Sequence, residues 1–168
     1  NNVTIMKKIL IALALFSSLS VSANQDAEVL GVAFGSTCEE TVQKLNKDYG
    51  TPKSQSADKL VYLNEMFEGF KADRVELGFQ DLQGTPKLNQ ARFYFVCPNK
   101  AAAIARMKSL VKKMETRYSV SYDEEDGGTA FYKGGNSPLG IGCLFTIFVS
   151  PYQGKWTCQL RYGKFQFK

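Results

Sequence analysis

The sequence contains no histidine. A chain without histidine cannot build a Ser-His-Asp triad, a Cys-His pair or a His-ligated zinc site. Carboxylate chemistry remains open, because residues 123–126 (Asp-Glu-Glu-Asp) gather four acids ahead of two glycines, and a glycosidase or a calcium site needs such oxygens. This run lacks the alternating ligand spacing of a calcium loop, so we interpret it as an exposed acidic turn. The sequence therefore predicts no catalytic residue, no metal ligand and no cofactor, and a carboxylate-based hydrolase is a less favoured alternative.

Long apolar runs are scarce, and the single one lies near the start of the chain. The charged segment Met6-Lys-Lys8 precedes the apolar residues 9–19, and Val21-Ser-Ala23 resembles a cleavage site, as in a secretory signal peptide. The residues before Met6 look like an upstream extension. Because the run is too short for a membrane-spanning helix, we expect residues 1–23 to be an extension and a cleaved leader. Residues 24–168 then form a single periplasmic or secreted domain with no stable membrane anchor.

A strong excess of charge of one sign is also absent. The formal net charge is +5, and loss of Lys7 and Lys8 with the leader lowers it to +3. A mildly basic surface is weak evidence for any anionic partner. The sequence therefore predicts no nucleic-acid partner.

The cysteines all follow the predicted cleavage site, at Cys38, Cys97, Cys143 and Cys158. An even number in an exported protein predicts two disulfides, for which three pairings exist. Each cysteine shares a face with apolar residues, so we expect all four to point into one core as inert cross-links. Cys38–Cys97 with Cys143–Cys158 is slightly favoured. A hairpin turn near Gln153 would nevertheless set Cys158 opposite about Val149, leaving Cys143 too far along its strand to bond without a bend.

The segment from Gly31 to Pro52 predicts a short strand, a helix and a sharp stop. Ser36 or Thr37 can cap the helix, with a glutamate three residues later closing a capping box, and Gly50 followed by Pro52 ends it. An apolar stripe runs along the helix at Cys38, Val42, Leu45 and Tyr49. This side must be covered by another element, which we expect to be a sheet.

The remaining elements follow from the spacing of apolar residues. Strands are predicted at 59–63, 74–80 and 87–97, a second helix at 100–118, and further strands at 129–133, 142–150 and 155–163. Residues 53–58 are expected to be a polar turn and 64–72 a loop. Because the order of elements recurs, with pseudo-repeats at about 31–97 and 98–168, we predict an α+β fold. It consists of two tandem helix-plus-three-strand units forming one antiparallel sheet with both helices on one face.

The opening segment resembles the small envelope modules of the BamE type (SmpA/OmlA-like). The tandem arrangement is similar to beta-lactamase-inhibitor-protein-like modules. The matching positions cover about residues 31–97 and are Gly35, Thr37, Val42, Leu45, Gly50, Thr51, Pro52, Tyr62 and Phe79. The resemblance implies a non-catalytic protein that works through its surfaces. Asn24 stands where BamE-type proteins carry a lipid-bearing cysteine, so their membrane tether does not carry over, and the second half lacks the Gly-Thr-Pro stop.

Aromatic residues placed where loops are expected predict a binding surface, since tyrosine and phenylalanine on a rigid sheet are typical anchors. The candidates are Phe67, Phe70, Tyr132 and Tyr152, with Tyr94 and Phe148 as further anchors on the outward sheet face. Each of them could instead cover the core beneath a loop. We hypothesise an exported, non-catalytic protein-binding or inhibitor module of the bacterial envelope, whose partner is another envelope or extracellular protein. A carrier of a small apolar ligand, held inside a curled sheet, is the alternative.

Overall fold

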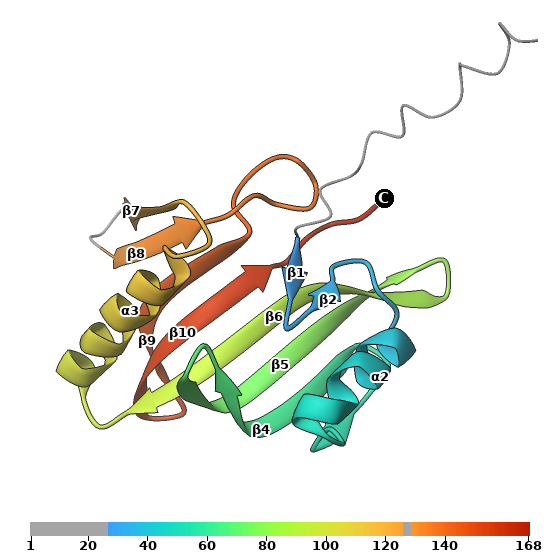
Figure 1. Cartoon of the computed structure of the whole chain (residues 1–168), viewed down its shortest axis with the longest axis horizontal. Helices are drawn as coiled ribbons and strands as arrows, with labels where there is room; N and C mark the ends of the chain where they lie inside the picture. The colour runs from blue at the N-terminus through green and yellow to red at the C-terminus, as the bar shows by residue number, and fades with distance from the viewer. Residues whose placement is uncertain (1–26, 126–128) are drawn as a thin grey trace, which may run out of the picture.

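The computed structural model describes residues 27–125 and 129–168, and within these it contains two helices and ten strands (Figure 1). In chain order the elements are β1 (Glu28–Val29), β2 (Val32–Ala33), α2 (Cys38–Tyr49), β3 (Ser54–Gln55), β4 (Lys59–Phe67), β5 (Phe70–Leu82), β6 (Thr85–Cys97), α3 (Lys100–Met114), β7 (Val120–Glu125), β8 (Thr129–Gly134), β9 (Phe145–Tyr152) and β10 (Lys155–Gly163). Neither helix has the length and apolar composition needed to cross a membrane.

The start of α2 confirms the predicted capping box. The Thr37 hydroxyl accepts from the Glu40 backbone N–H at 3.2 Å, and the Glu40 carboxylate accepts from the Thr37 N–H at 2.8 Å. These two bonds satisfy donors that have no partner inside the helix. The bond from the Thr37 N–H to the Glu40 carboxylate also holds the pKa of Glu40 below its usual value. Gly50 ends the helix with a φ of 66°, as predicted. The second helix begins after Asn99, whose side chain accepts from the Ala102 N–H.

The eight strands of the main sheet are all antiparallel, in the order β3-β4-β5-β6-β10-β9-β8-β7. Four strands follow each helix, and β6 pairs with β10 at the centre of the sheet. The predicted architecture of two tandem helix-plus-three-strand units with both helices on one face is therefore wrong. Besides the extra strands, the cover of the sheet is not made by helices alone, because the small β1–β2 sheet lies between α2 and α3 (Figure 1).

Two short strands account for the difference in strand number. Strand β3 lies within the expected polar turn 53–58 and pairs with β4. Strand β7 contains most of the acidic run that was interpreted as a turn, and it pairs with β8 along its whole length. Strand β3 has no apolar alternation, and β7 has it only at Val120 and Tyr122, which is too short a pattern to indicate a strand. Both are edge strands, where pairing with one neighbour suffices and polar side chains are common.

Tight turns explain why the expected loop at 64–72 is instead a hairpin. Glu68 and Gly69 both have positive φ, 52° and 83°, between strands β4 and β5. This is the signature of a two-residue type I′ turn, whose twist matches that of the flanking strands. A residue with positive φ followed by glycine also joins β5 to β6 and β9 to β10, at Gln83-Gly84 and Gln153-Gly154.

The core lies between the sheet and its cover. Alternate residues of the central strands point towards the helices and are fully buried, including Phe93 and Phe95 on β6 and Leu160 on β10. Helix α3 contributes Met107, Leu110, Val111 and Met114, and α2 contributes Leu45. The β1–β2 segment adds Val29, Val32 and Phe34. The opposite face of the sheet carries no helix in the described part of the chain.

Candidate protein-binding surface

The sheet face that points away from α2 and α3 is called the open face here. The pairing of the strands shows which residues belong to the open face, because side chains directly opposite each other on paired strands point to the same side of the sheet. Its central members are Val61, Leu63, Arg74, Glu76, Arg92, Tyr94, Val96, Thr146, Phe148, Tyr152, Thr157, Gln159 and Arg161. Leu63 and Val96 are 37% and 40% exposed. The open face therefore combines apolar, aromatic and arginine side chains on a rigid scaffold.

Aromatic rings occupy the β6 and β9 part of the open face. The rings of Tyr94 and Tyr152 stack with centroids 4.4 Å apart. Tyr94 is only 3% exposed, in part because Tyr152 covers its ring. This burial raises the pKa of the Tyr94 phenol. Phe148 lies under Arg161, whose guanidinium carbon is 5.3 Å from the ring centroid. The side chains of this face thus hold one another in place without a covering element.

Charge on the open face is dominated by arginine. Glu76 is the acidic residue among the central members of the open face. Its carboxylate forms ion pairs with Arg74, at an N···O distance of 2.7 Å, and with Lys59, at 3.8 Å. Towards β7 and β8, Asp123 pairs with Lys133, and this bond holds the pKa of Asp123 below its usual value. Arg92 and Arg161 make no ion pair with any described residue.

The structure does not bring the predicted anchors together on one surface. Phe67 is 6% exposed and its ring lies 4.3 Å from that of Phe93, so it belongs to the core on the helix side. Phe70 is half-buried against the same core, with the guanidinium of Arg106 4.7 Å from its ring centroid. Both residues face the core because the β4–β5 hairpin ends beneath the covering layer.

The other two anchors lie on opposite faces of the sheet. Tyr132 opposes Ile147 on the helix side and packs against the core, and its ring is 5.4 Å from that of Tyr122. Tyr152 lies at the end of β9 on the open face, stacked on Tyr94. Of the four anchors, Tyr152 alone lies on the open face, together with Tyr94 and Phe148, which strand alternation had placed there.

The cysteines are all free thiols in the structure. Cys38 is next in sequence to Thr37, which forms a β-bridge with Lys87 near the start of β6. Cys97 lies at the other end of the same strand. At about 3.3 Å per residue these two ends are roughly 30 Å apart. Cys158 opposes Val149, while Cys143 lies beyond the far end of β9. Neither favoured pair is brought together.

Cys97 and Cys158 are instead neighbours. Cys97 opposes Trp156 and Cys158 opposes Phe95 on adjacent strands, so the two thiols lie diagonally on the helix side. Both are buried. Burial, with a smaller contribution from the thiol of Cys97, raises the pKa of Cys158 to about 12.

Polar groups elsewhere do not form an obvious reaction centre. No cluster of three or more His, Cys, Asp or Glu side chains that could hold a metal occurs within 27–125 and 129–168. Asp126, part of the acidic run, lies outside the described residues. Asp123 is half-buried on β7 and engaged by Lys133.

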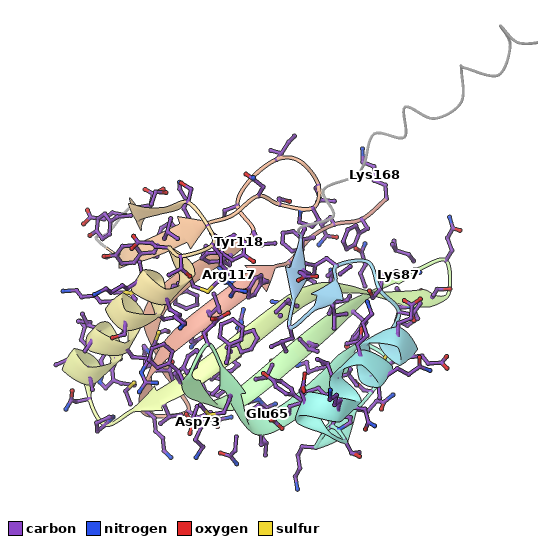
Figure 2. The ribbon with its side chains drawn as sticks, viewed as in Figure 1. Glu65, Asp73, Lys87, Arg117, Tyr118 and Lys168 are labelled. Carbon is purple, nitrogen blue, oxygen red and sulfur yellow. The ribbon has the colours of Figure 1, made fainter. Side chains whose placement is uncertain are left out.

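A cleft with a volume of about 800 Å³ lies at the C-terminal end of α3. Figure 2 shows Arg117 and Tyr118 there, beside β1. Arg117 pairs with Glu68, and the lining also includes Lys133, Ser119 and Asn136. This largely polar lining does not favour the apolar ligand of the carrier hypothesis.

Comparison of the chain with models of protein families, with characterised proteins and with solved structures finds no match.

Sequence reasoning missed Arg92 and Arg161 as site residues. Their outward position could be read from strand alternation, because Phe93 and Leu160 are their buried neighbours. What the sequence could not show is that β6 and β10 are adjacent in a register that places the two arginines opposite each other. These strands are separated by a helix and three further strands.

Proposed function

We propose that this protein is a non-catalytic protein-binding module that engages its partner with the open face of the sheet. The observation that supports this most directly is the composition of that face. Tyrosine, phenylalanine and arginine are the residues enriched at the centres of protein–protein interfaces. Here Tyr94, Phe148, Tyr152, Arg92 and Arg161 occupy neighbouring positions on β6, β9 and β10.

Rigidity is the second argument. The open face is formed by long, central strands, and β5 and β6 each have 13 residues. A partner binding there would order few side chains, because Tyr94 is already stacked and Arg161 already lies over Phe148. Preorganisation of this kind lowers the entropic cost of association.

The predicted leader at residues 1–23 makes the partner an envelope or extracellular protein. Such a module could inhibit a hydrolase or a toxin by covering its active surface. An inhibitor of this kind needs a shape-complementary face and no reacting group of its own.

Affinity capture tests the proposal. The chain from Asn24, in its oxidised form, is immobilised and exposed to envelope proteins, and the retained proteins are identified by mass spectrometry. Val96→Glu adds a charge to the open face at an exposed position, whereas Ser109→Glu adds the same charge on the exposed side of α3. We expect one stoichiometric partner that is retained by the wild type and S109E and lost from V96E.

Two results would overturn the proposal. If no protein is retained, a small molecule or a carbohydrate becomes the favoured ligand. Equal retention by V96E and S109E would mean that a bound protein uses another surface. The folding of both variants is compared by urea unfolding, so that loss of binding is not confused with loss of structure.

A further inference from the structure

Two arginines face each other at the centre of the open face. Arg92 on β6 is directly opposite Arg161 on β10. Like charges in this position repel and destabilise a sheet. Both residues are half-buried, so water screens them less than it would screen fully exposed side chains.

The nearby acid does not neutralise this pair. Glu76 is opposite Arg92 on the other neighbouring strand, β5. Its carboxylate is occupied by Arg74 Nε at 2.7 Å and by Lys59 Nζ at 3.8 Å. Among the described residues, no ion pair involves either Arg92 or Arg161. The centre of the open face therefore carries uncompensated positive charge.

Unsatisfied polar atoms lie in the same cross-strand row. The Nε of Arg92 is buried and has no hydrogen-bond partner, and neither has the buried Oγ1 of Thr146, which is opposite Arg161 on β9. The side-chain bond that Arg92 does make, from Nη1 to the Tyr94 hydroxyl, is long at 3.4 Å. Buried donors without acceptors are unusual in native proteins. The row that contains Arg92 and Arg161 therefore has unused hydrogen-bonding capacity.

The aromatic surroundings indicate which acceptor would use this capacity. Phe148 lies against Arg161, and Tyr94, whose ring stacks on Tyr152, accepts a hydrogen bond from Arg92. A docked partner would exclude water from this centre, where a bidentate arginine–carboxylate pair becomes strong. A long polyanion would need an extended basic track, but the positive charge here is confined to one row, and the net charge without the leader is only +3. A single acidic side chain fits better than a nucleic acid.

We propose that Arg92 and Arg161 form a receptor site for an aspartate or glutamate side chain of the partner protein. This inference rests on the proposed function and adds the chemistry that the partner must present. Arg92 and Arg161 select an acid, and the half-buried rings of Phe148 and Tyr152 supply the apolar contact area.

Random dodecapeptides displayed on phage are the probe, selected on the folded chain from Asn24. Counter-selection uses the R92Q/R161Q double variant, and Lys108→Gln, which removes one charge from the exposed side of α3, is the matched control. We expect enriched peptides that share an acidic residue. Changing that residue to its amide should weaken binding at least about 10-fold, as should R161Q, because each change removes one partner of a charged hydrogen-bonded pair. K108Q should bind like the wild type.

Further variants separate charge recognition from a structural role. R161K keeps the positive charge but loses the bidentate geometry and should bind between wild type and R161Q. In the free protein, R161Q should unfold at the same or a higher urea concentration than wild type, since it removes repulsion. A double-mutant cycle between R161Q and the peptide amide should show coupling, which a merely structural arginine would not produce.

The possible failures are distinguishable. One outcome is that peptide affinity falls when Phe148 and Tyr152 are changed, yet stays the same with R92Q, R161Q or the amide form of the peptide acid. In that case the proposed acid-binding site is wrong, and the proposal that the open face binds the partner stands. If no peptide survives counter-selection, or if the surviving peptides tolerate all open-face variants, both proposals fail. If single-stranded oligonucleotides compete as well as the acidic peptides, the site recognises polyanions and the inference of a protein acid is overturned.

Discussion

Truncation of Phe67 distinguishes a core residue from a surface anchor. Phe67 is 6% exposed, and its ring packs 4.3 Å from that of Phe93, which is fully buried. Removal of a buried phenylalanine side chain usually costs 3–5 kcal/mol, and the lost aromatic pair is included in that cost. Because Phe67 lies at the end of a hairpin that can partly collapse into the space, we expect Phe67→Ala to lower the free energy of unfolding by about 3 kcal/mol.

The assay is urea unfolding of the chain from Asn24, followed by circular dichroism and tryptophan fluorescence. The neighbouring Met66 is 57% exposed, so Met66→Ala is the matched control and should change stability by no more than about 0.5 kcal/mol. A loss below about 1 kcal/mol for F67A would refute the placement of Phe67 in the core. Equal losses for F67A and M66A would show that the hairpin is sensitive to any change and that burial is not the cause.

Two further predictions concern the helix cap and the cysteines. Thr37→Ala should cost about 1 kcal/mol at pH 7 because the N-cap acceptor is lost. The folded pKa of Glu40 is lowered, chiefly by the Thr37 backbone N–H. The stabilisation by the Glu40 carboxylate is therefore present above the ordinary pKa of 4.5 and is lost as the pH falls through the folded pKa. The stability difference between wild type and Glu40→Gln, measured by unfolding at pH 7 and pH 3, should shrink at the lower pH, and a difference that grows would contradict this sign. In the oxidised protein, peptide mapping should find Cys97 linked to Cys158 and never to Cys38, because only the first two lie on adjacent strands; a Cys38–Cys97 peptide would contradict the strand arrangement.

Local signals allowed the sequence to predict the helices and the long strands. The Thr37 cap and the Gly50 stop define α2. Regular alternation defines the inward residues of β6, so that Phe93 and Phe95 could be assigned to the core and Tyr94 to the outward face. In each case the physical rule acts over a few neighbouring residues.

Tertiary pairing decided what the sequence could not predict. Strand β7 is strongly acidic and alternates only at Val120 and Tyr122, yet it forms because β8 offers an unpaired edge and Lys133 neutralises Asp123. Phe67 was expected in a loop, but the type I′ turn at Glu68-Gly69 continues both strands and turns its ring into the core. The site depends on the same kind of pairing, since Arg92 and Arg161 meet only through the β6–β10 register.

Site-specific photo-crosslinking tests the use of the open face most directly. A photoreactive amino acid is placed at Leu63 or Val96, which are exposed on the open face, and at Ser109 on the exposed side of α3. Each variant is illuminated with the partner retained in the capture experiment. We predict crosslinks from positions 63 and 96 and none from 109. Crosslinks from position 109, with none from 63 or 96, would contradict the central claim that the protein binds its partner through the open face.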